Sequence, residues 1–223
     1  MRKIISLFQR NYDGDRLVRN EITPGAEWVA AGQGVATRKL DGTCCLVRDG
    51  KLFKRYEARV QFASAADPDG TGDRVGVRDG KSEGFRYVGK LPPGFEAATD
   101  PDPITLKQQG WVPVGDGSED RWHREAWANL KELLTIDACQ GAVSNGTYEL
   151  IGPKVQGNPE QYQHHMLVEH GAVELPCCPC DFDGLRNYLT MHDMEGIVWH
   201  HDDGRMVKIK GKDFGIKRSA RNG

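Results

Sequence analysis

Two hairpin patterns, each made of two short β-forming runs joined by an Asp-Gly pair, constrain the fold of this chain most strongly. The first joins residues 43–48 to residues 51–56 through Asp49-Gly50, and the second lies within EGIVWHHDDGRMVKIKG at residues 195–211. An Asp-Gly pair supplies the positive φ angles that a tight turn between antiparallel strands requires. Antiparallel hairpins with a few helices between them predict an α+β fold rather than a doubly wound parallel sheet.

The remaining strands and loops follow from local composition. The apolar run at residues 4–8 predicts a first strand, and the segment GTYELIG predicts a later one at residues 146–152. Gly, Asp and Pro are concentrated at residues 66–84 and 91–103, which predicts two loops. No stretch has the composition of a linker between domains, so residues 1–223 are expected to form a single domain.

Two segments have the apolar spacing of amphipathic helices. The first presents five residues toward the core: Trp122, Ala126, Leu130, Leu133 and Leu134. The second covers residues 182–192, with Asp181 as its predicted N-cap.

Composition indicates a soluble globular protein. The chain has 223 residues, of which 38% are hydrophobic and 28% charged, so it can bury a core. No run is long enough for a transmembrane helix, and the apolar run at residues 4–8 is too short for a secretory signal. Adjacent cysteines do not form a secreted disulfide framework; the six are Cys44, Cys45, Cys139, Cys177, Cys178 and Cys180. We therefore expect a cytoplasmic monomer without membrane association.

The net charge of −2 at pH 7 argues against a protein that coats nucleic acid indiscriminately. Basic residues are nevertheless concentrated at the C-terminal end, where residues 205–223 contain seven basic residues and one aspartate. Such a segment is either a solvated chain end or a surface for phosphate groups.

Four polar elements follow one another along the predicted strands. KLDG places Lys39 at the end of a short strand, just before the turn-forming pair Asp41-Gly42. YELIG and EGIVW carry Glu149 and Glu195 in or beside otherwise apolar strands, and KIK at residues 208–210 presents two lysines to one face. Burial of a carboxylate is unfavourable unless it meets a cation or a metal ion. Taken alone, each carboxylate also fits a structural ion pair, KIK an exposed amphipathic strand, and Lys39 a solvated charge. The ordered set favours a functional cluster.

In this order, the elements resemble motifs I, III, IV and V of the covalent nucleotidyltransferase superfamily, the ATP-dependent ligases and mRNA capping enzymes. The longer strings KLDGTCC, YELIGPKVQGNP and EGIVWH resemble the small stand-alone RNA ligases that join 5′-phosphate to 3′-hydroxyl ends. From Lys39 to Lys210 the resemblance covers 172 of the 223 residues. It implies an antiparallel-sheet nucleotidyltransferase (adenylation) domain of the ATP-dependent ligase type, without a C-terminal OB-fold.

The resemblance implies ATP as a substrate, Mg²⁺ or Mn²⁺ as a cofactor, and RNA with 5′-phosphate and 3′-hydroxyl ends as the partner. Lys39 would attack the α-phosphate of ATP to form Lys39–AMP, and the AMP would pass to the RNA 5′-phosphate before the ends are joined. Only a neutral amine can attack, and neutralising an ordinary lysine at pH 7 requires about 4.6 kcal/mol. Neighbouring cations and partial burial lower this requirement.

The resemblance also implies roles for individual residues. The catalytic set is Lys39, Glu195, Lys208 and Lys210. The nucleotide-binding set is Lys39, Leu40, Arg55, Glu149, Lys208 and Lys210. The expected metal ligands are Asp41, Glu149 and Glu195. In this scheme the lysines of KIK stabilise negative charge on the α-phosphate, and Arg55 holds a phosphate with its guanidinium fork.

Two departures from the family pattern bear on the substrate. Many ligases carry arginine two residues after the glycine of motif I, where this chain has Cys44, and this argues against a DNA ligase. Because no OB-fold is expected after Lys210, RNA would bind the adenylation domain itself. The candidate contacts are Lys212, Lys217, Arg218 and Arg221, with Arg10, Arg16 and Arg19 as the next set. The aromatic group that stacks on adenine is left open among Tyr148, Tyr162 and His165.

Other functions fit parts of the sequence. A capping-type guanylyltransferase or a DNA ligase would share the fold. A zinc-stabilised binding module would use the C-x-x-C pair Cys177 and Cys180 with nearby histidines, which are His164, His165, His170 and His192. A single C-x-x-C pair is a weak signal for zinc.

Overall fold

The computed structural model describes residues 4–62, 74–75, 84–136 and 143–218. The chain forms two compact units, which we call the central unit (Cys44–Gly146) and the terminal unit (Lys3–Thr43 with Thr147–Gly223). Both units combine a few short helices with mainly antiparallel strands, which confirms the predicted α+β class. The single-domain organisation of residues 1–223 stays a prediction.

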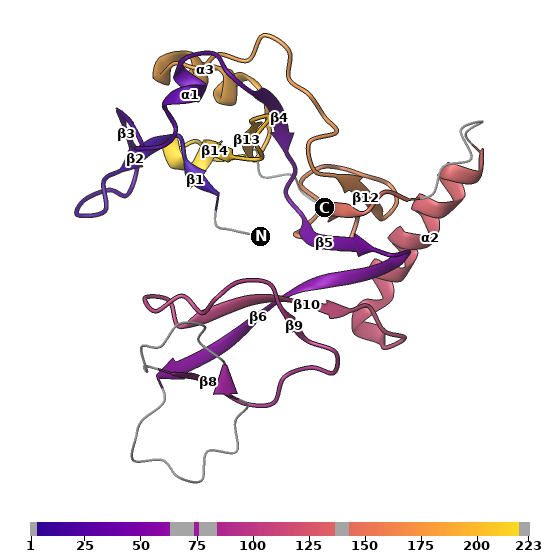
Figure 1. Cartoon of the computed structure of the whole chain (residues 1–223). Helices are drawn as coiled ribbons and strands as arrows, with labels where there is room; N and C mark the ends of the chain where they lie inside the picture. The colour runs from indigo at the N-terminus through magenta and orange to yellow at the C-terminus, as the bar shows by residue number, and fades with distance from the viewer. Residues whose placement is uncertain (1–3, 63–73, 76–83, 137–142, 219–223) are drawn as a thin grey trace. The chain divides into compact units, whose positions relative to one another are not determined.

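The central unit is built on the first predicted hairpin. Its elements are β5 (Thr43–Arg48), β6 (Lys51–Phe62), β7 (Arg74–Val75), β8 (Phe85–Tyr87), β9 (Glu96–Ala97), β10 (Lys107–Pro113), η1 (Ser118–Asp120) and α2 (Arg121–Ile136) (Figure 1). The strands β5, β6, β10 and β9 are neighbours in that order, and β8 pairs with β6 and β7. Asp49 and Gly50 have φ angles of 51° and 69°, as a tight hairpin turn requires.

The predicted loops and helix of the central unit are partly borne out. Most of residues 66–84 lies outside the described residues, and the loop at 91–103 contains the short strand β9. On α2, Ala126 is fully buried as expected, but the prediction that Leu133 faces the core was wrong, because its side chain is 48% exposed. A periodic apolar pattern predicts that a helix forms more reliably than it predicts which of its apolar side chains become buried.

The terminal unit contains the rest of the described chain. Its elements are β1 (Ile5–Ser6), β2 (Phe8–Arg10), β3 (Val18–Ile22), α1 (Glu27–Ala30), β4 (Val35–Lys39), β11 (Gly146–Ile151), β12 (Met166–Glu169), α3 (Phe182–Met191), β13 (Gly196–His200), β14 (Met206–Lys210) and η2 (Gly211–Phe214). Four of the strands form a sheet in the order β1-β14-β13-β4, in which only the β1–β14 pair is parallel. The side chain of Asp181 accepts a hydrogen bond from the Gly184 amide at 2.8 Å, which confirms the predicted N-cap of α3.

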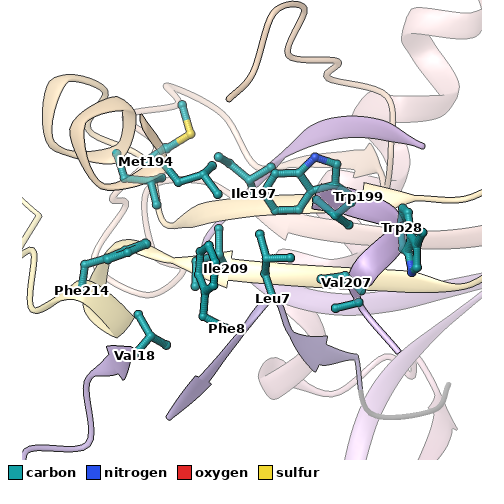
Figure 2. Packing of buried hydrophobic residues seen from close by; sticks show 14 residues of the cluster. Leu7, Phe8, Val18, Trp28, Met194, Ile197, Trp199, Val207, Ile209 and Phe214 are labelled. Atoms are coloured by element: carbon teal, nitrogen blue, oxygen red, sulfur yellow. The ribbon is translucent and has the colours of Figure 1, made fainter. Parts of the chain in front are cut away.

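Side chains along β13 and β14 point alternately to the hydrophobic core and to the polar face of this sheet. Ile197, Trp199, Val207 and Ile209 are all buried, and α1 and α3 contribute Trp28 and Leu185 to the same cluster. Figure 2 shows these strand residues packed with Leu7, Phe8 and Phe214. Burial of each large apolar side chain contributes about 1.5–3 kcal/mol to stability. With Ile209 in the core, Lys208 and Lys210 must point to the other face.

Glycine is required where backbones approach each other beside this polar face. A Cβ atom on Gly196 would lie 2.2 Å from the carbonyl oxygen of Ile209, and one on Gly42 would lie 2.1 Å from that of Leu150. Both distances are far below any tolerated contact, so β13 and the turn after Lys39 can occupy their positions only with glycine there. No helix of the described residues is both long enough and apolar enough to cross a bilayer.

Candidate active site

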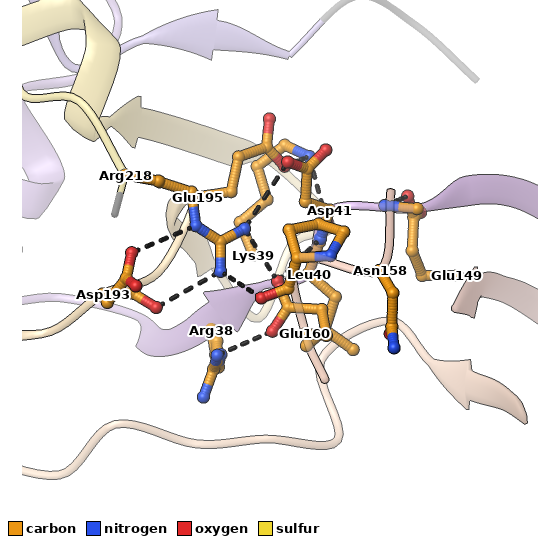
Figure 3. A network of polar contacts seen from close by, with 12 residues as sticks. Arg38, Lys39, Leu40, Asp41, Glu149, Asn158, Glu160, Asp193, Glu195 and Arg218 are labelled. Atoms are coloured by element: carbon orange, nitrogen blue, oxygen red, sulfur yellow. Dashed lines mark hydrogen bonds and ion pairs between the residues drawn. The ribbon is translucent and has the colours of Figure 1, made fainter. Parts of the chain in front are cut away.

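Lys39 and Lys210 meet at the carboxylate of Glu195. Gly196 pairs with Lys39 of β4 on one side and with Lys210 of β14 on the other. Glu195, the preceding residue, therefore projects between the two lysines. Its Oε2 accepts a hydrogen bond from Nζ of Lys39 at 2.5 Å, and its Oε1 accepts one from Nζ of Lys210. Figure 3 shows Lys39 and Glu195 within a larger polar network.

The two carboxyl groups beside Lys39 respond differently to this environment. Burial would raise the pKa of Glu195, but the charge of Lys39 and the hydrogen bonds from Lys210 and Lys39 outweigh it and hold that pKa below its ordinary value. Burial, followed by the negative charge of Glu195, raises the pKa of Asp41. Glu195 is therefore the more firmly ionised of the two at neutral pH.

Lys208 is electrostatically distinct from Lys210, although both lie on the same face of β14. Burial, followed by the charges of Lys210 and Lys39, lowers the pKa of Lys208 from 10.5 to about 8. In the described part of the chain Lys208 forms no ion pair. The charges of Lys39 and Lys210 both act on Lys208, and a cluster of three amines of this kind attracts a phosphate group.

Replacement of Lys208 by methionine is expected to stabilise the fold at pH 7. The native state binds fewer protons at Lys208 than the unfolded state between about pH 8 and pH 10.5, so wild-type stability rises with pH in this window. Below pH 8 the buried charge disfavours folding, and Lys208→Met removes it. Thermal unfolding should show a gain of a few degrees at pH 7 that shrinks toward pH 10.5.

The exposed Lys212 gives the matched control, since Lys212→Met should leave the melting temperature unchanged at both pH values. A Lys208→Met protein that melts below the wild type at pH 7, or a difference that does not shrink at high pH, would contradict the buried-charge account.

The turn that follows Lys39 is held by two glutamates. Leu40 is buried and anchors the strand end, as the alternation predicts. The amide of Gly42 donates to Oε1 of Glu149 at 3.0 Å, and the amide of Asp41 donates to Oε1 of Glu160 at 3.2 Å. The other oxygen of Glu149 lies 2.8 Å from Nε2 of His170. Glu149, predicted to contact nucleotide or metal, thus also fixes the backbone beside Lys39.

Sequence reasoning missed Glu160 and its ion pairs. Its carboxylate is 2.6 Å from a guanidinium nitrogen of Arg38 and 3.2 Å from one of Arg218. Arg218 also contacts Asp41 at 3.5 Å and Asp193 at 3.3 Å (Figure 3). Glu160 lies beyond the strand predicted at residues 146–152, and no periodic pattern indicated that this segment returns to Lys39.

The surroundings of the remaining predicted basic residues differ. Arg55 is on β6 of the central unit, where its Nε donates to Gln109 at 2.7 Å, so its role at a phosphate stays a prediction. Lys212 and Lys217 are exposed, and Arg221 lies outside the described residues. The guanidinium of Arg218 is hydrogen-bonded to Asp41 and Glu160, so its contact with RNA stays a prediction. Of the second basic set, Arg16 and Arg19 are exposed and Arg10 forms an ion pair with Asp213.

Two of the three candidates for stacking on adenine are also corrected. Tyr148 and His165 are only 4% and 3% exposed, so neither ring presents a face to a ligand. The ring nitrogen Nε2 of His165 instead lies 3.3 Å from the amide of Lys154. Tyr162 is partly exposed and stays a candidate.

The expected metal ligands do not converge as a set. The ligand atoms of Asp41, Glu149 and Glu195 are not all within 4.8 Å of one another. Within the described residues Cys177 and Cys180 likewise form no such group with the nearby histidines, so the zinc-module alternative has no structural support. Cys178 lies between these two cysteines in the sequence. Its burial, followed by the electrostatic effect of Cys180, raises the pKa of its thiol to about 12, which disfavours a thiolate.

Comparison with known proteins identifies the family. The family model described as RNA ligase 1 matches residues 100–222, more than half of the chain. The chain belongs to the RNA ligase 1 family. Proteins named RNA ligase 1 from Danio rerio, Rattus norvegicus and Pongo abelii are 25%, 26% and 29% identical to it. Each alignment covers 82% of this chain and 67% of the relative. This confirms the resemblance to RNA ligases.

The residues matched by the RNA ligase 1 model include most of the polar cluster. Glu149, Glu160, Glu195 and the lysines of β14 fall within the match, whereas Lys39 precedes it. Membership of this family favours an RNA ligase over the capping-enzyme and DNA-ligase alternatives.

Proposed function

We propose that this chain is an ATP-dependent RNA ligase that joins 5′-phosphate and 3′-hydroxyl ends through a covalent Lys39–AMP intermediate, on a nucleotidyltransferase fold. The observation that carries the proposal is the approach of Lys39 and Lys210 to one partly buried carboxylate, that of Glu195, at the end of a mainly antiparallel sheet. Membership of the RNA ligase 1 family supports RNA as the substrate.

In the first step, the neutral amine of Lys39 attacks the α-phosphorus of ATP. A nitrogen–phosphorus bond forms, the bond from that phosphorus to the oxygen bridging to the β-phosphate breaks, and pyrophosphate leaves with the bonding electron pair. The amine loses a proton to solvent, which leaves a phosphoramidate. Lys39 suits this role because it lies at a strand end, fixed by Leu40 in the core and by its hydrogen bond to Glu195.

Lys208 and Lys210 would stabilise the negative charge that develops during this step. Lys210 is held beside Lys39 by Glu195, and Lys208 is partly buried, where the charges of both amines act on it. In such a partly buried site a cation interacts with phosphate oxygens more strongly than it does in water. Burial, followed by the charges of Lys210 and Lys39, lowers the pKa of Lys208, and binding of a phosphate group would offset the part that comes from repulsion.

Glu195 is the carboxylate best suited to hold Mg²⁺ or Mn²⁺. Oxygen ligands fit these ions, and Mg²⁺ commonly takes only one or two carboxylates and retains several waters. Both oxygens of Glu195 are bonded to lysines, and Glu149 is bonded to Gly42 and His170, so a metal ion would exchange with one of these partners. When bound, the ion would act as a Lewis acid on the α-phosphate.

The remaining steps use RNA. A phosphate oxygen of the 5′ end attacks the phosphorus of Lys39–AMP, which releases the lysine and forms an adenylylated 5′ end. The 3′-hydroxyl then attacks the 5′-phosphate, and AMP leaves as the phosphodiester forms. Lys212 and Lys217 are exposed and remain candidates for contact with the RNA backbone.

Incubation with ATP labelled at the α-phosphate, together with Mg²⁺, is expected to give a covalent, acid-labile label on the protein. A 5′-phosphorylated RNA should then remove the label and be sealed to a 3′-hydroxyl end. A parallel incubation with labelled GTP should leave the protein unlabelled. Labelling by GTP alone would indicate a guanylyltransferase, and the absence of label from both nucleotides would overturn the proposed mechanism.

A further inference from the structure

Glu160 is the most deeply buried charged group near Lys39, yet it belongs to none of the sequence motifs. Its side chain is only 1% exposed. It binds Arg38, which precedes Lys39, and Asp41, which follows Leu40. One oxygen pairs with the Arg38 guanidinium at 2.6 Å, and the other accepts the Asp41 amide at 3.2 Å. A single carboxylate thereby fixes the residue before Lys39 and the second residue after it.

The loop that carries Glu160 is held in an uncommon conformation. Gln156, Asn158 and Gln161 all have φ angles between 49° and 56°, a region that residues other than glycine rarely adopt. The side chain of Asn158 closes the loop by two hydrogen bonds of 3.0 Å to the backbone of Tyr162, on either side of Glu160. Backbone strain of this kind persists where the surrounding structure over-determines it, and is concentrated at functional sites.

Two guanidinium groups, those of Arg38 and Arg218, balance the buried negative charge of Glu160. Arg218 contributes a second guanidinium 3.2 Å from the carboxylate and is itself anchored by Asp193 and by the carbonyl of Pro159. The Nε atom of Arg38 is buried without a hydrogen-bond partner in the described structure, so the Arg38 guanidinium depends on Glu160. Removing the charge of Glu160 would release Arg38, and with it the strand end at Lys39.

We propose that Glu160 is a positioning residue for Lys39, which sets the strand end and the following turn so that the amine is aimed at the α-phosphate. This role rests on the proposed function. Glu160 does not touch the reacting atoms; it acts through Arg38 and the Asp41 amide. Because a displacement of about 1 Å can slow a reaction about 100-fold, loss of this support should slow the attack by Lys39 more than it weakens ATP binding.

Single-turnover labelling of Glu160→Gln with α-labelled ATP separates positioning from stability. The substitution keeps the shape of the side chain and one accepting oxygen, and removes the charge. We expect the rate constant for Lys39–AMP formation to fall about 10- to 100-fold, with a nucleotide dissociation constant close to that of the wild type. A purely structural role would instead lower the fraction of protein that reacts, at an unchanged rate constant, and this outcome would overturn the proposal.

A second measurement uses RNA that already carries AMP on its 5′-phosphate. Sealing of this substrate does not require Lys39 as a nucleophile, so Glu160→Gln should seal it at close to the wild-type rate. An equal loss in both reactions would also overturn the positioning role. Arg38→Gln, at a partly exposed residue, should reproduce the selective loss if Glu160→Gln does not fold.

The matched control is Glu169→Gln, which removes an exposed carboxylate from β12 of the same unit and should leave both reactions unchanged. Failure of the proposed function is distinguishable, because the wild-type protein would then form no Lys39–AMP at all, and the role of Glu160 would fall with it.

Discussion

Replacement of Lys39 by alanine is expected to abolish covalent labelling by α-labelled ATP, with a loss of more than about 10³-fold, because no other group can supply the nucleophile. Lys208 and Lys210 point to the same face but belong to β14, so neither occupies the end of β4. Lys39→Arg should be equally inactive, since a guanidinium stays protonated at neutral pH. Label yield, measured by mass spectrometry of the intact protein, checks both variants.

The fold should tolerate these substitutions. The Lys39 side chain is partly exposed at a strand end, and the core residues of the sheet lie on its opposite face. Circular dichroism and melting temperature should therefore stay close to those of the wild type. Lys39→Ala should also retain sealing of RNA whose 5′-phosphate already carries AMP. A folded Lys39→Ala protein that still acquires the label would place the nucleophile elsewhere.

The sequence predicted the parts of the site that depend on strand periodicity. Alternation placed Lys39 at the lip of a strand and put both lysines of KIK opposite the buried Ile209, and the structure agrees. Alternation could not show which of Lys208 and Lys210 binds Glu195, because this contact depends on how the strands pair in register. Only the alignment of Gly196 with Lys39 and Lys210 shows which amine reaches Glu195.

The parts that the sequence did not predict depend on loop conformation and tertiary burial. The loop that carries Glu160 has positive φ angles at Gln156 and Asn158, and although asparagine tolerates this conformation, the residue types do not show where the loop then places Glu160. The sequence placed Arg218 in a basic C-terminal segment. The net charge of a segment does not show which of its cations form ion pairs, so the partners of Arg218 were not predicted. His165 read as a possible stacking group, although the backbone beside it leaves its ring no open face.

Substitution of Glu195 by glutamine or alanine is expected to reduce Lys39–AMP formation by more than about 100-fold. Two effects oppose each other here. Without the carboxylate, the Lys39 amine is no longer held in an ion pair that it must leave before it attacks, and two unit charges about 4 Å apart attract each other by about 4 kcal/mol at an effective dielectric constant of 20. Against this, the substitution removes the one carboxylate of the described residues that binds both the Lys39 and the Lys210 amines, and with it the predicted metal ligand. Orientation contributes up to about 7–11 kcal/mol and Lewis-acid catalysis several more, so the loss should dominate.

Three variants of this residue separate charge from shape. Glu195→Asp keeps the charge but shortens the side chain, Glu195→Gln keeps the shape but removes the charge, and Glu195→Ala removes both. If charge at this position holds the lysines and a metal ion, Glu195→Asp should retain the most activity, and high Mn²⁺ should restore part of it. Glu169→Gln, at an exposed site, serves again as the control for loss of one acidic group. Wild-type labelling rates for Glu195→Gln at ordinary Mg²⁺ would reduce Glu195 to a structural ion-pair partner of Lys39 and Lys210, and the metal would then have to bind elsewhere in the site.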